Sequence, residues 1–432
     1  MLIEGEISSP HRKDGPREAL PERGGTPLNH AAIPRRAVLA GLGIGGLAAA
    51  APAWAAGSVK LPLPGGPDTR DLTTAFPGKG SMILQRTQPP LLETPFEVFD
   101  QGVFTPNDQF YVRWHWASIP TEVDAKTFRL KVHGHVDREL SLSLDEIARL
   151  PRFEIAAVNQ CSGNSRGLFE PRVPGAQWAN GSMGNARWTG VRLKDVLDRA
   201  GVRTGAMQVR FSGLDEPVVN DAPDFKKSLA LDHARGGEVM LAYAMNGEQL
   251  PLLNGFPLRL VVPGWYSTYW VKMLSDVEVL DKPDEQYWMK TAYRISDVPG
   301  ANIKPGQTGF KTVPINRMVP RSFVTNLQDG AKVAAGAPVA VRGIAFGGDC
   351  GVRAVDISSD GGVTWSPAKL GADEGPYSFR RFEGDLPALA AGAHAIKVRC
   401  TNTNGLAQPM DRVWNGAGFM QNGVETVSLQ VA

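Results

Sequence analysis

The chain has 432 residues, of which 46 are lysine or arginine and 44 are aspartate or glutamate. This length provides for two to three domains with a sizeable hydrophobic core. Because the charges nearly balance, the composition gives no reason to expect nucleic acid or an acidic membrane surface as a partner.

Residues 1–55 have the features of an export signal. The pair Arg35 and Arg36 precedes a glycine- and alanine-rich apolar run at residues 40–51, and an Ala-x-Ala pattern ends at Ala55. The run is too short to cross a bilayer, which takes about 20 apolar residues. We therefore expect cleavage after Ala55 and export to the periplasm by the twin-arginine route. Because that route carries folded proteins, it favours a cofactor that is inserted beforehand.

The next stretches predict an extended arm and then a strand with a polar face. Residues 56–88 predict the arm, and a first domain follows over residues 89–311. Aromatic and β-branched residues predict a strand on which Tyr111, Arg113 and His115 share one face, with apolar side chains on the other. We interpret the polar face as a ligand site, and the alternative is an edge strand whose arginine and histidine are solvated.

The strongest candidate for a site is the stretch Asn-Gln-Cys-Ser-Gly-Asn-Ser-Arg at residues 159–166. An apolar run at 153–158 predicts a buried strand that delivers Cys161 to a tight turn of small residues. Arg166 follows five residues later. A thiolate at a strand end beside a cation is typical of a nucleophile or a metal ligand. The alternative is a buried structural cysteine.

The remainder of the first domain mixes strands and helices. Ser143 and Glu146 form a capping-box pattern, and a helix at 193–200 is predicted to end at Gly201. A long loop is predicted at 167–188, and long loops within a compact domain are usually functional. Strands are predicted at 128–136, 208–212, 240–243 and 258–262. Since no regular strand–helix–strand alternation is present, we predict an α+β domain and not a dinucleotide fold.

Residues 312–432 predict a second, all-β domain. Its strands are expected at 338–346, 354–359, 377–384, 395–400 and 425–431. Asp360-Gly361-Gly362 is typical of a hairpin turn. The alternation and spacing fit an immunoglobulin-like sandwich.

The cysteines and histidines limit which metal sites the chain can build. The only cysteines are Cys161, Cys350 and Cys400, and no Cys-x-x-Cys pattern is present. With five histidines after the export signal, a zinc site of three or four protein ligands is hard to assemble. Cys350 and Cys400 either form a disulfide after export or remain separate thiols. With His115 as its base, Cys161 would serve a Cys/His hydrolase, an alternative that stays open here.

Arginines around Cys161 favour the binding of an oxyanion. Arg113, Arg166, Arg172 and Arg187 offer planar, permanently charged donors, although surface ion pairs are the alternative use for each. A metal held by one thiolate, with its other ligands from an organic cofactor, fits the shortage of protein ligands. A molybdenum–pterin dithiolene is a centre of that kind.

These motifs together resemble the sulfite oxidase family of molybdenum enzymes, and within it the bacterial periplasmic sulfite dehydrogenases and the sulfane dehydrogenase subunit of the sulfur-oxidising system. The resemblance runs from about residue 89 to the C-terminus. It is carried by the stretches at 110–115, 160–166, 183–188, 241–247, 254–259 and 287–294. It implies a molybdopterin-binding mixed α/β domain followed by an immunoglobulin-like dimerisation domain.

The resemblance also implies a role for each site residue. Cys161 would ligate molybdenum, Arg113 and Arg166 would hold the substrate anion, and Tyr293 would lie near the reacting oxygen. From the residues themselves, we expect Trp178 to form a wall of the pocket. Arg259 and Lys272 would hold the pterin phosphate. The implied cofactor contacts are Tyr111, Arg113, His115, Cys161, Asn254, Arg259, Trp270 and Lys272. Asn254 departs from the histidine that animal members carry, so this contact differs from theirs.

The implied reaction is oxidation of sulfite to sulfate by oxygen-atom transfer. Because the chain has no haem motif, we expect its electrons to pass to a separate c-type cytochrome, in a homodimer or in a heterotetramer with that partner. The nearest alternative is the sulfane dehydrogenase subunit, which acts on carrier-bound sulfane sulfur. An alternative from another class is a cofactor-free periplasmic binding or assembly module in which Cys161 is structural.

Overall fold

The computed structural model describes residues 55–432. The predicted export signal, residues 1–55, therefore lies outside the described residues except for its last position. Within residues 55–432, no helix has the length and apolar character that crossing a membrane requires.

The chain begins with a five-stranded antiparallel sheet. Its order is β1 (Ala55–Lys60), β2 (Thr69–Thr73), β3 (Met82–Arg86), β4 (Leu91–Glu93) and β5 (Val112–Arg113). Within residues 56–88, expected as an extended arm, the strands β1, β2 and β3 pair with one another, and Met82 and Ile83 are buried. The short helices α1 (Val98–Gln101) and η1 (Asn107–Gln109) lead into β5.

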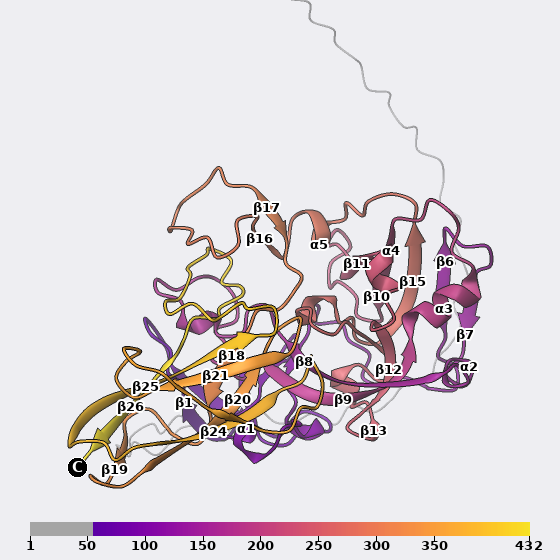
Figure 1. Ribbon diagram of the computed structural model, residues 1–432. Helices are drawn as coiled ribbons and strands as arrows, with labels where there is room; N and C mark the ends of the chain where they lie inside the picture. The colour runs from indigo at the N-terminus through magenta and orange to yellow at the C-terminus, as the bar shows by residue number, and fades with distance from the viewer. Residues whose placement is uncertain (1–54) are drawn as a thin grey trace, which may run out of the picture. The chain divides into compact units, whose positions relative to one another are not determined.

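Two more sheets complete the first domain (Figure 1). One has the order β11 (Lys226–Ala230), β10 (Gln208–Gly213), β15 (Leu274–Leu280), β6 (Leu130–Gly134) and β7 (Leu140–Leu142). The other has the order β13 (Glu248–Gln249), β12 (Met240–Met245), β9 (Met183–Arg192) and β8 (Arg152–Gln160), and β14 (Arg259–Val261) pairs with β12. Only β15 and β6 run parallel in these sheets. The predicted α+β class is confirmed.

The helices follow the sequence signals closely. Ser143 caps α2 (Leu144–Ala148) in a complete capping box, and Gly201, with φ of 73°, ends α3 (Leu193–Ala200). The remaining helices are η2 (Arg166–Leu168), α4 (Leu231–Ala234), η3 (Leu252–Asn254), η4 (Ser267–Tyr269) and α5 (Tyr287–Lys290). The predicted loop at 167–188 is shorter than expected, because its last six residues join β9 and pair with β8.

The C-terminal domain is the predicted β-sandwich. A small ribbon of β16 (Arg294–Ser296) and β17 (Thr312–Pro314) precedes it. One sheet has the order β18 (Arg321–Val324), β20 (Val339–Phe346), β24 (Arg380–Leu386) and β23 (Lys369–Leu370). The other has the order β19 (Ala331–Val333), β26 (Thr426–Val431), β25 (Gly392–Asn402), β21 (Val352–Ser358) and β22 (Ser366–Pro367). The core between the two sheets of the sandwich includes Val341, Ile357, Phe382 and Leu429. Cys350 and Cys400 are separate thiols here.

A hydrophobic core joins the two domains behind the cysteine strand. Val158 and Met183, from β8 and β9, pack in one cluster with Phe323, Ile344 and Phe379 of the sandwich. The backbone N–H of Val158 also donates to the carbonyl of Tyr377, at 2.8 Å. The strand that delivers Cys161 is therefore fixed by both domains.

Candidate active site

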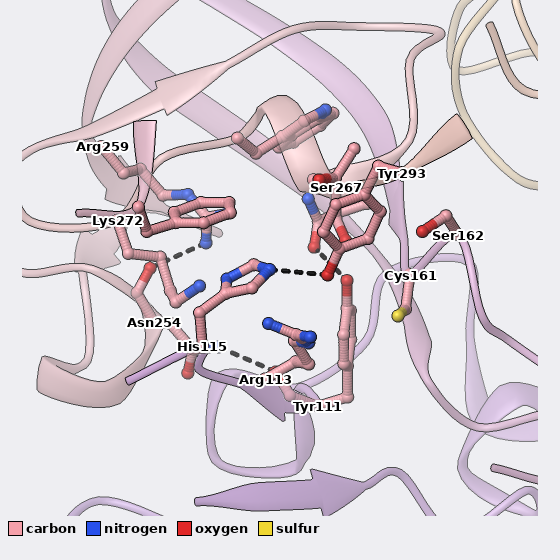
Figure 2. A pocket seen from close by; sticks show the side chains of 14 residues that line it. Tyr111, Arg113, His115, Cys161, Ser162, Asn254, Arg259, Ser267, Lys272 and Tyr293 are labelled. Carbon is pink, nitrogen blue, oxygen red and sulfur yellow. Dashed lines mark hydrogen bonds between the residues drawn. The ribbon is translucent and has the colours of Figure 1, made fainter. Parts of the chain in front are cut away.

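Cys161 directly follows β8 and faces a buried cavity (Figure 2). Its N–H donates to the carbonyl of Ser182 at 2.9 Å, and its own carbonyl accepts from Asn164 at 2.9 Å, which closes the tight turn. The side chain is 6% exposed. The strand end and the turn thus hold the sulfur at a fixed place, as the sequence predicted.

A second element brings three predicted side chains to the same cavity. Tyr111, Arg113 and His115 all line it, as the alternation around β5 predicted. The Tyr111 hydroxyl donates to Asn159 Oδ1 at 2.7 Å, and His115 Nε2 lies 2.6 Å from the Tyr293 hydroxyl. The imidazole stacks on Phe225 with 3.5 Å between ring centroids. His115 thus bonds to Tyr293 and not to Cys161, so the base that a Cys/His hydrolase needs is already engaged.

Segments 254–259 and 270–272 supply the cationic wall of this first cavity. Arg259 donates to the carbonyl of Asn254 at 2.7 Å, and its guanidinium lies 4.8 Å from the centroid of the Trp188 ring. Gly255, with φ of 113°, lets the segments approach, since an added Cβ would lie 3.2 Å from Lys272 Cα. Trp270 completes this wall.

Burial shapes the charges of the first cavity. It lowers the pKa of Lys272 to about 7, aided by nearby Arg259, and lowers the pKa of Arg259 to about 10. Burial, with Arg113 second, also holds the pKa of His115 well below its ordinary value, so this ring is neutral at neutral pH. Burial raises the pKa of Tyr293, so its hydroxyl keeps its proton.

A second cavity, of about 220 Å³, shares Arg113, His115, Cys161, Ser162 and Tyr293 with the first. Arg166 lines only this second cavity. The backbone packs closely around the Arg166 guanidinium. A Cβ added at Gly163 or Gly175 would lie 2.7 Å from the nearest guanidinium atom. Burial lowers the pKa of Arg166 from its ordinary value.

All ten predicted site residues line these two cavities, nine of them the first and Arg166 the second. Trp178, expected as a wall of the pocket, lines the second cavity. Arg172 and Arg187 do not belong to the site. Arg172 donates to the carbonyl of Pro64 at 2.6 Å, and Arg187 pairs with Glu374 at 2.9 Å. These two arginines serve structural contacts, and their proposed use in binding an oxyanion was wrong.

Several lining residues escaped the sequence analysis. Asn159 and Ser162 flank Cys161 within the stretch at 159–166, where their polarity beside the cysteine was the available signal. The others have no local signal: Phe225, Ser267 and Thr268 in the first cavity, and Arg86, Pro89, Leu91, Gly175, Ala176 and Phe419 in the second. Lys79 was also missed. It is buried beneath the first cavity and donates to Asn254 Oδ1 at 2.5 Å.

Comparisons with known proteins place the chain among molybdopterin-binding oxidoreductases. The family model described as "Oxidoreductase molybdopterin binding domain" matches residues 116–288, and "Mo-co oxidoreductase dimerisation domain" matches residues 312–431. Chicken sulfite oxidase is 32% identical to this chain over 378 residues, an alignment that covers 83% of this chain and 80% of the chicken protein. Mouse mitochondrial sulfite oxidase is 34% identical over 353 residues, 78% of this chain. This chain spans only 64% of the length of the mouse protein.

A solved structure is also similar. The sulfane dehydrogenase SoxCD from Paracoccus pantotrophus superposes with a TM-score of 0.66 at 25% sequence identity. The match covers 79% of this chain and 84% of the other. It therefore extends over both the first domain and the β-sandwich.

Proposed function

The chain belongs to the sulfite oxidase family of molybdenum enzymes, and on that premise we propose that it oxidises sulfite to sulfate. The observation that carries this proposal is the position of Cys161 between two cavities. The first holds Arg259 and Lys272, and the second holds Arg166, while Arg113 borders both. A cofactor on one side of the sulfur and a small oxyanion on the other would each find positive charge.

The residues of the first cavity fit a molybdopterin. Five residues that line it each have a buried side-chain atom without a hydrogen-bond partner within the described residues: Arg113 Nη1, Asn159 Nδ2, Ser162 Oγ, Arg259 Nε and Thr268 Oγ1. Each unpaired buried polar group costs roughly 1–3 kcal/mol, so their grouping indicates a polar ligand. A pterin offers hydrogen-bond donors and acceptors for these atoms. Arg259 and Lys272 would bind its phosphate, and the Cys161 thiolate would ligate molybdenum. When bound, this centre supplies oxygen-atom transfer and accepts two electrons.

The residues of the second cavity would bind and orient the sulfur oxyanion. Arg113 Nη1 and Arg166 Nε are buried and without a partner in residues 55–432. Preorganised donors of this kind favour the charge of the anion throughout the reaction. When the neutral His115 carries its proton on Nε2 and donates it to the Tyr293 oxygen 2.6 Å away, the Tyr293 hydroxyl can donate its own proton to a substrate oxygen.

We also propose that the enzyme works in the periplasm and delivers its electrons to a c-type cytochrome. The twin-arginine pattern at residues 35–36 supports the location, and the absence of a haem-attachment motif in the sequence supports a separate acceptor. The match of residues 312–431 to a dimerisation domain supports an oligomer.

Oxidation of carrier-bound sulfane sulfur is the second candidate function. The likeness to the sulfane dehydrogenase SoxCD over most of both chains favours it. Both candidates use the same cofactor and the same Cys161, and they differ in what enters the second cavity.

Metal analysis combined with a sulfite assay tests the proposal. We expect the purified protein to contain molybdenum and to reduce ferricyanide or a c-type cytochrome with sulfite. Cys161→Ser should abolish this turnover and leave the melting temperature nearly unchanged, because the side chain borders a cavity. Molybdenum-loaded protein that ignores sulfite but oxidises a persulfide-loaded carrier would support the second candidate. Full activity in Cys161→Ser would refute the assignment of the metal ligand.

A further inference from the structure

The second cavity combines cations with an apolar wall. Arg113 and Arg166 line it together with Leu91, Trp178 and Phe419. Its volume of about 220 Å³ is many times the ~10–15 Å³ that one water needs by the same measure. A sulfite ion is one sulfur with three oxygens, so it can use the cations but gains nothing from hydrocarbon. The cavity therefore has room and apolar surface that sulfite does not need.

Phe419 reaches this cavity from the C-terminal domain. The Asn415 side chain donates to the Phe419 carbonyl at 2.9 Å and accepts from its N–H at 3.1 Å. The N–H of Met420 donates to the carbonyl of Ser162 at 2.9 Å. Since Ser162 adjoins Cys161, this loop is tied directly to the turn that carries the sulfur, and the ring has a fixed place beside it.

The Phe419 ring covers part of the anion-binding wall. Its centroid lies 5.0 Å from the Arg166 guanidinium carbon, and it stacks on Tyr293 with 5.4 Å between centroids and 20° between planes. Arg166 Nη2 donates to the Ala417 carbonyl at 3.2 Å, whereas Nε has no partner among the described residues. A group that reaches Arg166 Nε therefore lies beside an aromatic ring.

We propose that this site also oxidises organic sulfinates to sulfonates, with Phe419 contacting the organic substituent. This inference rests on the proposed oxidation of sulfite at the same site. A sulfinate, R–SO2⁻, has the sulfur lone pair of sulfite and two oxygens for the arginines, and R replaces the third oxygen. The half-reaction is R–SO2⁻ + H2O → R–SO3⁻ + 2 H⁺ + 2 e⁻. One S–O bond forms, both O–H bonds of water break, and the electrons pass to a one-electron acceptor such as ferricyanide.

The test uses the holoenzyme, with benzenesulfinate and sulfite compared in a ferricyanide assay. Calorimetry measures the binding of benzenesulfonate and of sulfate to the oxidised enzyme, which adds a readout that is independent of turnover. We expect benzenesulfinate to be oxidised and benzenesulfonate to bind more tightly than sulfate. In Phe419→Ala, the ratio of kcat/KM for benzenesulfinate to that for sulfite should fall about tenfold, as should the affinity ratio of benzenesulfonate to sulfate.

Two further variants make the result decisive. Phe419→Leu keeps an apolar side chain in the cavity, and the kcat/KM ratio and the affinity ratio should each fall about threefold. If Phe419→Ala does not fold, these two ratios in Phe419→Leu test whether Phe419 contacts the substituent. Phe310→Ala, at an exposed phenylalanine that lines neither cavity, should leave both ratios unchanged.

The outcomes that contradict the inference differ from those that contradict the proposed function. If sulfite is oxidised, benzenesulfinate is ignored and benzenesulfonate binds no better than sulfate, the inference is wrong and the proposed function stands. If the ratios are the same in the Phe419 variants as in the parent enzyme, Phe419 does not recognise the substituent. If neither substrate is oxidised by molybdenum-loaded enzyme, the proposed function itself fails.

Discussion

The cations of the site differ from many other arginines and lysines of the described residues, which lie beside a carboxylate. Arg187, Arg210 and Arg317 pair with carboxylates within 4.0 Å. Among residues 55–432, no such pair includes Arg113, Arg166, Arg259 or Lys272. Buried positive charge without a carboxylate is costly, so an anion that completes these groups gains free energy on binding. These unpaired cations support the proposal that negatively charged ligands bind on both sides of Cys161.

Arg113→Met tests the role of the anion-binding charge. We expect kcat/KM for sulfite to fall because a charged hydrogen bond is lost, a loss of about 1.5–3 kcal/mol, or roughly 10- to 150-fold. Steady-state kinetics with ferricyanide measure it. Arg187→Met removes an arginine that pairs with Glu374 outside both cavities, so its kinetics should match those of the parent. Normal kinetics in Arg113→Met would contradict the placement of the substrate.

The buried lysines predict how stability depends on pH in protein produced without cofactor. Burial lowers the pKa of Lys79, Lys227 and Lys272 to about 7 each, from 10.5 in the unfolded chain. Between pH 7 and 10.5 the unfolded chain thus binds more protons, so the free energy of unfolding rises with pH. Each lysine contributes at most about 1.4 kcal/mol per pH unit.

Lys272→Met should reduce this rise, because it removes one of the groups that take up a proton on unfolding. Urea unfolding at several pH values between 7 and 9 measures the slope. Lys60→Met, whose side chain is 80% exposed in the folded protein, provides the matched control and should keep the slope of the parent. An equal slope in Lys272→Met would show that this lysine is not buried in the cofactor-free protein.

At the scale of elements, the turn after β8 depends on a strand of the sandwich. Arg321, on β18, is 1% exposed and donates to Ser165 Oγ at 2.9 Å and to Glu425 at 2.8 Å. Ser165 has a φ of 66°, an unusual conformation for a residue with a side chain, and it directly precedes Arg166. Asn180 donates to the other oxygen of Glu425 at 2.6 Å. This network fixes the backbone from which Arg166 extends.

Arg321→Met should destabilise the protein by about 3 kcal/mol, because Glu425 and Ser165 lose a partner in a buried setting. Urea unfolding measures the change, and Glu425→Gln in the same chain should restore part of it. Arg342→Met is the comparison, since that arginine pairs with Asp100 and is 44% exposed, and it should cost less than about 1 kcal/mol. A loss in Arg321→Met no larger than in Arg342→Met would show that the network is not important for stability.

For the whole molecule, the two domains act as one unit around the site. They share the cluster that contains Val158 and Phe323. The C-terminal domain also supplies Phe419 to the second cavity and the Ala417 carbonyl to Arg166. Because the second domain contributes part of its wall, the first domain alone does not enclose the second cavity.

Truncation after residue 311 therefore should yield a protein that aggregates or fails to retain molybdenum. The physical reason is that Val158, Met183 and Tyr266 would lose the apolar side chains that cover them. Size-exclusion chromatography and metal analysis of the truncated chain measure this. A soluble, molybdenum-loaded and sulfite-oxidising truncated chain would contradict the shared core.

The sequence by itself determined the local features, which are the faces of strands, the ends of helices and the position of turns. Alternation placed Tyr111, Arg113 and His115 on one face, capping residues set the ends of α2 and α3, and small residues marked the turn after Cys161. These features follow from the periods of strands and helices and from local hydrogen bonds, which a short window of sequence contains. The order of several long motifs likewise identified the family.

Only the tertiary structure decided which distant segments meet. It brought Phe225 and Phe419 to the cavities and Lys79 to Asn254, a residue that lines the first of them. It also assigned Arg172 and Arg187 to carbonyl and carboxylate partners elsewhere. The sequence marks an arginine as a donor but does not show which acceptor lies within 3 Å of it. That choice is set by packing between segments hundreds of residues apart, whose free energy belongs to the folded chain as a whole.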